Sequence, residues 1–355
     1  MPARLVLEDG HEFHGFSFGA GLSAAGEVVF STAMTGYPES LSDPSYKGQI
    51  LVSTFPLIGN YGVPVMKQAN GLPENFESEK VQVTGLVIAD YSFSYSHWNA
   101  EKSLAEWLQQ QNVSGIYGVD TRAITKIIRE EGAMLGKIII NRDPGYYDPN
   151  KENLVAKVSS GEIKTYGSGR YRIVLVDCGT KNNIIRCLLK RDTTVTVVPW
   201  DRLPDPALYD GVLLSNGPGD PALCDRTIEN TRQMLEGDKP VFGICLGSQI
   251  MALAAGGKTY KLKYGHRSHN QPVILPADQR CFVTSQNHGY AVDSKSMPLN
   301  WEVWFRNLND DTCEGIRHKE KPFIAVQFHP EASAGPVDTE FLFDDFMNLV
   351  RERCR

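Results

Sequence analysis

The sequence predicts an α/β protein of two domains, a mixed α/β domain followed by a doubly wound, mostly parallel sheet. The chain has 355 residues, which is more than one hydrophobic core usually organises. Strand-like runs and turns dominate its first part, whereas strands alternate with helices in its last part. We place the domains at 1–142 and 170–355, joined by a linker at 143–169 that is rich in Asp, Pro, Gly, Tyr and Ser.

Composition and charge restrict the class of protein. Hydrophobic residues make up 41% and charged residues 22% of the chain, as in ordinary globular proteins. The net charge of -6 gives no basic surface for nucleic acid or anionic lipid. No apolar run is long enough for a membrane helix, and the N-terminus does not resemble a signal peptide. We therefore expect a cytoplasmic protein that binds neither nucleic acid nor membranes.

The first domain is predicted from turns and apolar runs. Asp9-Gly10 separates two strand-like stretches and favours a hairpin, because both residues accept positive φ. The spacing of apolar residues predicts helices over 100–110 and 121–131, the second capped by Asp120. Further strands are expected in the apolar runs at 27–30, 49–55 and 81–88.

The second domain alternates short buried strands with helices. This order predicts parallel strands, and such sheets place their functional sites beyond the carboxyl ends of the strands. The expected strands are 172–177, 194–198, 211–215, 241–244 and 322–328, and the expected helices are 181–190, 225–236 and 247–256.

One of seven cysteines lies in a special context. The odd count and the absence of C-x-x-C favour neither a disulfide framework nor a zinc site, and we expect no metal. Cys245 lies between Gly243 and Gly247 at a strand-to-helix junction, the pattern of a nucleophile elbow. The helix N-terminus favours a thiolate, and the Leu246 amide is placed to bind an oxyanion. The alternative is a buried structural cysteine beside glycines that allow helix packing.

A histidine and a glutamate follow another predicted strand. His329 and Glu331 are two residues apart, so their side chains emerge on one side of an extended chain, and Pro330 restrains the turn between them. Glu331 can then orient His329 as the general base for a thiol. The alternative is a solvated pair at a strand end.

Two polar segments are further candidates. The turn containing Gly217 and Gly219 leaves backbone amides open for an oxyanion or a substrate, although a simple tight turn explains it equally. The segment 285–290 is expected to be a loop in which Asn287 fixes a polar substrate. His288 is a rival base, but no carboxylate stands at a useful spacing, which favours a structural histidine.

Together these segments resemble the class I, or triad-type, glutamine amidotransferases. The motifs NGPGD, GICLG-x-Q, SQNHG and HPE occur in the family's order. The resemblance implies that Cys245 attacks the glutamine side-chain amide, that His329 is the base oriented by Glu331, and that water hydrolyses the resulting thioester. It also implies oxyanion amides at Gly219 and Leu246, and glutamine contacts at Gly217, Gly219, Leu246, Gln249, Asn287, Gly289 and Tyr290.

The N-terminal half resembles the small subunit of carbamoyl-phosphate synthases. The resemblance rests on LVLEDG, GEVVF, TGYPE, DPSYKGQI, LIGN and GVDTR. It implies that Ser45 contacts the bound glutamine. It also implies a partner, which is the large subunit or a fused synthetase domain. We assign the ATP, Mg²⁺ and bicarbonate chemistry to that partner, because this chain has no G-x-x-x-x-G-K-[ST] motif. No cofactor is expected in this chain. Segments 96–98 and 198–201 resemble the fused eukaryotic enzymes more closely.

Two positions depart from the family pattern. Ser248 stands where the family usually has histidine, and Tyr290 where many members have phenylalanine. Ser248 motivates an alternative, a non-catalytic glutamine-binding regulatory module. A second alternative is a stand-alone γ-glutamyl amidohydrolase, although such an enzyme does not need the N-terminal half. The sequence leaves open whether the product enters arginine or pyrimidine synthesis.

Overall fold

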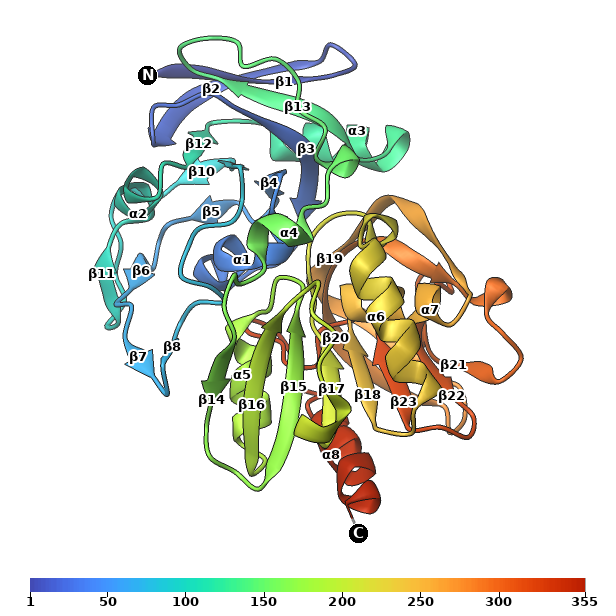
Figure 1. The fold of residues 1–355 in the computed structure, drawn as a ribbon. Coiled ribbons are helices and arrows are strands. Elements are labelled where there is room, and N and C mark those ends of the chain that lie inside the picture. The colour runs from blue at the N-terminus through green and yellow to red at the C-terminus, as the bar shows by residue number, and fades with distance from the viewer. Residues whose placement is uncertain (355) are drawn as a thin grey trace. The chain divides into compact units, whose positions relative to one another are not determined.

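The computed structural model describes residues 1–354 and contains two compact units, Met1–Glu152 and Asn153–Arg355 (Figure 1). The second unit begins inside the predicted linker. That segment contains helix α4 (Val155–Val158) and strand β14 (Lys164–Tyr166), and β14 forms an antiparallel pair at the edge of the second unit's sheet. A three-residue polar strand is too short to give a periodic signal in the sequence.

The first unit is built on a closed barrel. The predicted hairpin is present, with β1 antiparallel to β2 and Gly10 in the turn at φ 94°. Closure leaves the barrel without an exposed edge strand. Around the barrel the strands follow the order β1 (Pro2–Leu7), β13 (Met134–Ile139), β3 (Ala24–Ser31), β4 (Gln49–Ser53), β9 (Gly85–Val87), β12 (Ser114–Tyr117) and β2 (Glu12–Gly19).

Helices and short strands surround this barrel. Helix α3 (Thr121–Glu131) has the predicted bounds, and the Asp120 side chain accepts a hydrogen bond from Ala123 N at 2.9 Å. Helix α2 (Leu104–Gln110) starts later than predicted because Ser103 and Glu106 form a capping box, while the preceding residues pair as β11. The remaining elements are α1 (Tyr37–Ser42), η1 (Pro44–Tyr46), β5 (Leu57–Ile58), β6 (Val63–Pro64), β7 (Gln68–Ala69), β8 (Leu72–Pro73), β10 (Asp90–Tyr91), β11 (Ala100–Lys102) and η2 (Pro149–Lys151).

The second unit contains a ten-stranded sheet with a parallel centre. Its central strands β16, β15, β17, β18 and β23 run parallel, as predicted for a doubly wound fold, and antiparallel strands extend both edges. The full order is β14, β16 (Thr193–Pro199), β15 (Tyr171–Asp177), β17 (Gly211–Leu214), β18 (Val241–Ile244), β23 (Phe323–Val326), β22 (Cys313–His318), β20 (Arg280–Asp293), β19 (Lys258–Leu275) and β21 (Trp301–Asn307).

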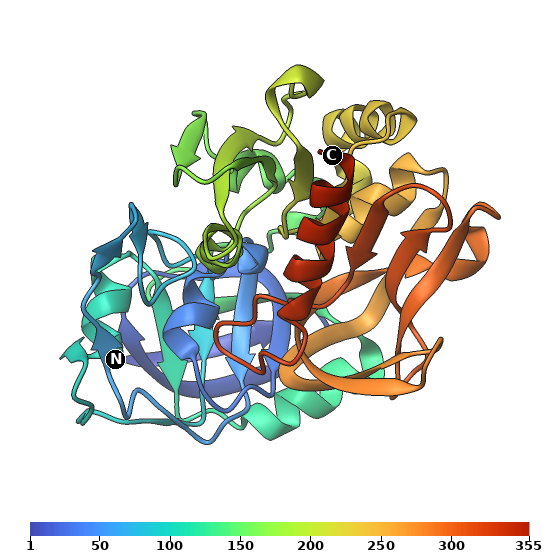
Figure 2. The same ribbon diagram turned by 90° about the horizontal axis from the view of Figure 1, so that it is seen from below.

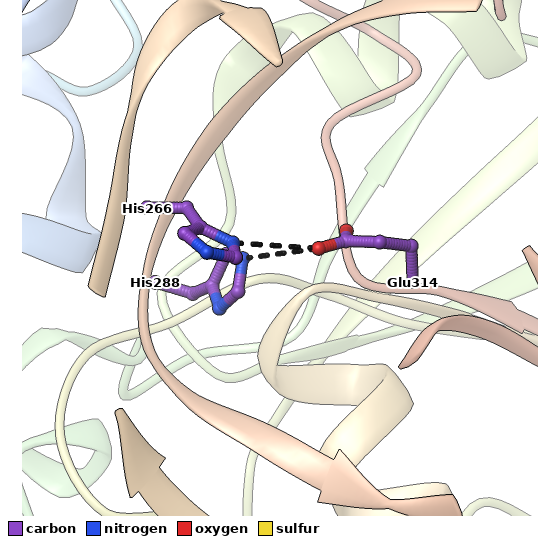
Figure 3. A group of neighbouring side chains, drawn as sticks. All are labelled: His266, His288 and Glu314. Carbon is purple, nitrogen blue, oxygen red and sulfur yellow. Dashed lines mark ion pairs between the residues drawn. The ribbon is translucent and has the colours of Figure 1, made fainter. Parts of the chain in front are cut away.

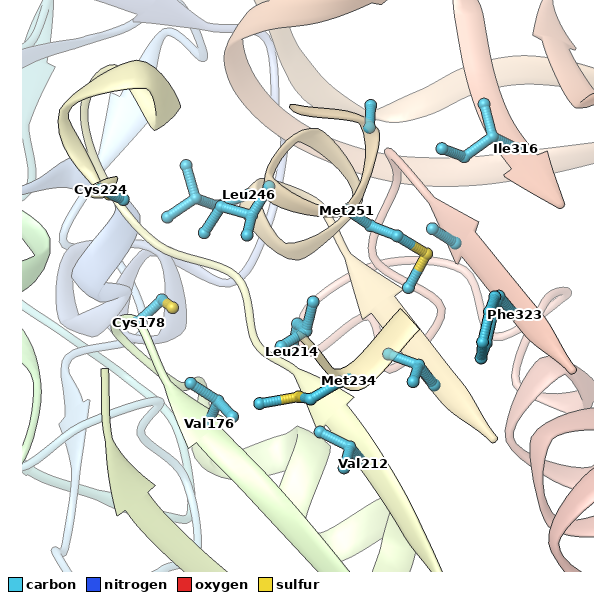
Figure 4. Close-up of a cluster of buried hydrophobic side chains, with 14 of the residues drawn as sticks. Val176, Cys178, Val212, Leu214, Cys224, Met234, Leu246, Met251, Ile316 and Phe323 are labelled. Carbon is cyan, nitrogen blue, oxygen red and sulfur yellow. The ribbon is translucent and has the colours of Figure 1, made fainter. Parts of the chain in front are cut away.

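Helices cover both faces of this sheet (Figures 1 and 2). On one face, Phe242 packs against Phe343 and Phe346 of α8, with ring centroids 5.9 and 5.6 Å apart. On the other face, Met234 and Met251 join a buried apolar cluster with the strands (Figure 4). The helices are α5 (Asn182–Leu189), α6 (Asp225–Glu236), α7 (Leu246–Ala254) and α8 (Phe341–Arg353), and the short 3₁₀ turns are η3 (Pro206–Leu208), η4 (Pro221–Leu223) and η5 (Ser294–Ser296).

This topology brings three candidate segments to one sheet edge. Strands β17, β18 and β23 are neighbours and run parallel, so their carboxyl ends lie together. The turn with Gly217 and Gly219 follows β17, Cys245 follows β18, and His329 follows β23. The edge therefore collects groups that are up to 112 residues apart in sequence, from Gly217 to His329, as expected for open α/β sheets. Within residues 1–354, no helix is long and apolar enough to cross a membrane.

Candidate active site

Cys245 occupies a strained turn between β18 and α7. Its φ of 53° and ψ of -105° are unusual for a residue with a side chain, and its backbone N donates to Val326 O at 2.8 Å. The flanking glycines are needed for close packing. A Cβ on Gly247 would lie 2.2 Å from Leu214 O, and one on Gly243 would lie 2.7 Å from Gly247 O. The local geometry is that of a nucleophile elbow.

The His329 imidazole is oriented by Glu331. Its Nδ1 lies 2.7 Å from Glu331 Oε1, and both side chains are buried, so the alternative of a solvated pair is wrong. The His329 backbone is fixed by a hydrogen bond from its N to Ser285 O at 2.9 Å. Because Nδ1 donates to the carboxylate, Nε2 is the ring nitrogen that can gain or lose a proton, and this buried atom has no hydrogen-bond partner among residues 1–354. Nε2 is therefore available for proton transfer.

Charges at the site favour an ion pair between sulfur and imidazole. Burial lowers the pKa of His329, but the negative charges of Glu331 and Cys245 outweigh it and raise this pKa to about 10. Burial raises the pKa of Glu331, whereas Lys181 and His329 lower it, and the net result is a pKa of about 2. A charged imidazole beside a thiolate is the resting state expected for a cysteine nucleophile.

Lys181 is a site residue that the sequence reasoning missed. It is 4% exposed, its Nζ lies 3.2 Å from Glu331 Oε1, and it donates to Ala332 O at 2.6 Å. Asn183 on the same helix donates to Glu331 O. The only signal was a lysine at the first position of a predicted helix, 181–190, which is normally a solvated position. Lys181 keeps Glu331 ionised and fixes the chain that follows it.

The segment 285–290 is not a loop, contrary to our prediction. It belongs to β20, which pairs with β19 in a long antiparallel hairpin. Its polar residues give no strand pattern, but pairing with β19 buries them and satisfies their backbone groups. Asn287 O consequently lies 3.7 Å from Cys245 Sγ and accepts its hydrogen bond.

Other predicted glutamine contacts lie around the cysteine. The Gln249 side chain, 2% exposed, donates to Tyr290 O at 2.8 Å. A Cβ on Gly217 would lie 2.1 Å from Cys178 O, so a close approach requires this glycine, whereas Gly219 requires its positive φ of 84°. The roles of these residues in glutamine binding, including Gly289, and the oxyanion amides of Gly219 and Leu246 stay predictions.

Ser45 belongs to the first unit. It lies in η1, is 6% exposed, and its backbone N donates to Asp43 Oδ1 at 2.9 Å. Pro44 and the Asp43 cap hold this turn in a defined conformation. The contact of Ser45 with glutamine stays a prediction.

His288, the rival base, belongs to a buried cluster with His266 and Glu314 (Figure 3). Its Nδ1 lies 2.8 Å from Tyr290 O and its Nε2 3.1 Å from Gln286 Oε1, and burial holds its pKa well below the usual value. A carboxylate is nearby after all, since Glu314 Oε1 lies 3.9 Å from Nε2, but it comes from the neighbouring strand β22, which is 26 residues further along the chain. These contacts suit a structural histidine.

The same cluster is the candidate for metal binding within the described chain, because its three ligand atoms lie within 4.8 Å of one another. Each residue already has protein partners. His266 Nε2 lies 2.8 Å from Asp310 Oδ2 and its Nδ1 3.4 Å from Glu314 Oε1, and Gln286 donates to Glu314 Oε2 at 3.0 Å. An imidazolium between two carboxylates, the buried Glu314 and the exposed Asp310, accounts for the cluster as a partly buried ion-pair network.

Asp310→Asn should lower the pKa of His266. Burial lowers this pKa, but Asp310 and Glu314 outweigh burial and raise it from 6.5 to about 9. A raised folded-state pKa stabilises the fold below about pH 6.5, and this stabilisation disappears as pH rises through about 9. As pH rises, the Asp310→Asn variant should lose this stabilisation at a lower pH than the wild-type protein. NMR titration of the imidazole signals measures the pKa of His266. An unchanged His266 pKa in Asp310→Asn would contradict the role given to Asp310. Asp311→Asn, a substitution at the neighbouring residue, is the control.

Comparisons with known proteins agree with this geometry. The family model "Carbamoyl-phosphate synthase small chain, CPSase domain" matches residues 5–138, and "Glutamine amidotransferase class-I" matches residues 174–349. The arginine-specific small chain of carbamoyl phosphate synthase from Saccharomyces cerevisiae is 48% identical, covering 99% of this chain and 89% of the yeast protein.

Longer proteins are equally similar. The mitochondrial carbamoyl-phosphate synthase [ammonia] of Homo sapiens is 51% identical over 99% of this chain, and the multifunctional protein pyr1-3 of Dictyostelium discoideum is 50% identical over 98%. This chain spans only 24% and 17% of their respective lengths. High identity over both units, together with the elbow and the His329–Glu331 pair, shows that the chain belongs to the carbamoyl-phosphate synthase small-chain family, with a class I glutamine amidotransferase domain.

Proposed function

We propose that this chain hydrolyses L-glutamine to glutamate and ammonia, and that the ammonia passes to a carbamoyl-phosphate synthetase subunit or domain. The observation that carries the proposal is the strained Cys245 elbow beside a buried, correctly oriented His329–Glu331 pair. The strain supports a reactive rather than a structural cysteine. Membership of the family supports the link to carbamoyl phosphate.

The proposed reaction has two steps. The Cys245 thiolate attacks the side-chain amide carbon of glutamine and forms a C–S bond, while the His329 imidazolium protonates the leaving nitrogen, which departs as ammonia. Neutral His329 then takes a proton from water, a C–O bond forms, and the C–S electron pair returns to sulfur. The Gly219 and Leu246 amides would stabilise the oxyanion in each step.

A synthetase partner follows from the chemistry of ammonia. At neutral pH free ammonia is mostly protonated and therefore a poor nucleophile, so internal delivery to an acceptor site is favoured. The ATP, Mg²⁺ and bicarbonate chemistry is assigned to the large subunit or fused domain, with no cofactor in this chain. The yeast relative is a separate small chain and the Dictyostelium relative a multifunctional protein, so both arrangements occur among relatives. A cytoplasmic location remains a prediction.

Labelling with a diazo ketone analogue of glutamine tests the proposed nucleophile. We expect one covalent adduct per chain, on Cys245, with glutamine protecting against it. Cys281 and Cys354 are the exposed thiols among the described cysteines, so a variant with both replaced by alanine should still be labelled. Peptide mass spectrometry locates the adduct. A folded protein that gives no adduct at Cys245 would sink the catalytic proposal.

A regulatory, non-catalytic module is the second candidate. Ser248 replaces the family's usual histidine directly behind the elbow, and the human relative is named an ammonia-dependent synthase. Under this alternative glutamine would bind without turnover. Measured glutamate release in the presence of the synthetase partner separates the two candidates, because only the catalytic proposal predicts it.

A further inference from the structure

Gln327 lies against the Cys245 sulfur but takes no part in the two proposed steps of glutamine hydrolysis. It sits between β23 and His329, it is 1% exposed, and its backbone N donates to Glu314 O at 2.9 Å. Its side-chain Nε2 lies 3.6 Å from Cys245 Sγ, within hydrogen-bond distance for sulfur. The effect of this buried amide on the thiol depends on its orientation. The NH₂ group would donate a hydrogen bond to the sulfur, whereas the amide oxygen could only accept one.

A backbone carbonyl fixes the orientation of this amide. Gln249 Nε2 lies 2.8 Å from Tyr290 O, and because a carbonyl oxygen only accepts, the Gln249 atom must be the NH₂ group. The same nitrogen lies 3.0 Å from Gln327 Oε1, which must therefore be the acceptor. The remaining atom of Gln327, its NH₂, then faces Cys245. Flipping either amide would place two acceptors or two donors in contact.

The sulfur therefore lies between a donor and an acceptor. Gln327 offers N–H, whereas Asn287 O, 3.7 Å away, only accepts. A neutral thiol can donate its hydrogen to Asn287 O, but a thiolate has no hydrogen to donate. Of these two contacts Gln327 is the one that favours the thiolate, and hydrogen bonds to charged groups are stronger than those to neutral ones.

We propose that Gln327 is a catalytic residue that donates a hydrogen bond to Cys245 Sγ. The inference rests on the proposed glutaminase function. In the resting enzyme the bond stabilises the thiolate beside the His329 imidazolium. During thioester hydrolysis it receives the negative charge that returns to sulfur as the C–S bond breaks. Gln249 acts through Gln327 as a positioning residue, because its amide sets the orientation of the Gln327 amide.

The variants Gln327→Met and Gln327→Leu test the proposal in the full chain. Both replace the amide with an apolar group of similar size and so remove the donor. We expect the apparent pKa of the Cys245 thiol, measured from the pH dependence of alkylation by iodoacetamide, to rise by about one unit or more. We also expect kcat for glutamine hydrolysis to fall about 10- to 100-fold with a much smaller change in KM.

Gln286→Met is the matched control, because Gln286 on β20 is equally buried, at 2% exposed, but bonds Glu314 instead of the sulfur. It should leave the thiol pKa unchanged. The proposal is overturned if either folded Gln327 variant keeps the wild-type thiol pKa, and the second variant serves if the first does not fold. If the wild-type protein itself is not labelled by the glutamine analogue, the proposed function fails instead, so the two failures are distinguishable.

Discussion

Cys245→Ala should abolish glutamine-dependent synthesis of carbamoyl phosphate and leave ammonia-dependent synthesis by the assembled enzyme largely intact. Without the sulfur no thioester can form, and loss of a nucleophile in a comparable catalytic unit costs about 10⁵-fold or more in kcat. Ammonia supplied from solution bypasses this step. The measurement is carbamoyl phosphate formation with each nitrogen source, using this chain assembled with its synthetase partner.

Cys224→Ala is the matched control for this substitution. Cys224 is 1% exposed and packs in the apolar cluster of the second unit, so its loss removes a buried sulfur without touching the elbow. We expect a modest loss of stability and near-normal glutamine-dependent synthesis. Loss of both activities in a correctly assembled Cys245→Ala complex would contradict the proposed division of labour between the two components.

The parts of the site that the sequence predicted are those with local determinants. The elbow could be recognised because Gly243 and Gly247 flank the cysteine within five residues, and each is needed for a close backbone contact. His329 and Glu331 could be paired because a spacing of two fixes their relative direction. Alternation of strands and helices likewise predicted the parallel sheet, and parallel neighbours then bring these segments to one edge.

The parts that escaped prediction depend on contacts between distant segments. Lys181 and Glu331 are separated by 150 residues, and nothing around the lysine indicates that it is buried. Gln327 could be read only as a strand residue, because its role depends on the orientation that Gln249 imposes. The strand at 285–290 is stabilised by β19 rather than by its own composition. The order of strands in the first unit's barrel is likewise set by nonlocal pairing.

Lys181→Met should destabilise the second unit by about 3 kcal/mol, the lower end of the cost of breaking a buried ion pair, because His329 still partners the carboxylate. The substitution removes a buried cation that lies 3.2 Å from Glu331, whose side chain is fully buried, and the hydrogen bond to Ala332 O. The measurement is the free energy of unfolding in urea. Lys190→Met on the same segment is the control: its Nζ lies 3.0 Å from Glu340 in an exposed pair that should contribute less than about 1 kcal/mol.

The pH dependence of stability separates a lost charge pair from lost packing. The lowered pKa of Glu331, about 2 against 4.5, stabilises the fold above about pH 4.5, and this stabilisation disappears as pH falls towards 2. Without Lys181 the pKa of Glu331 should rise, so the variant should unfold in acid at a higher pH than the wild type. A loss of stability that is the same at every pH would mean that Lys181 acts through packing alone, and Glu331 would then owe its ionised state to His329.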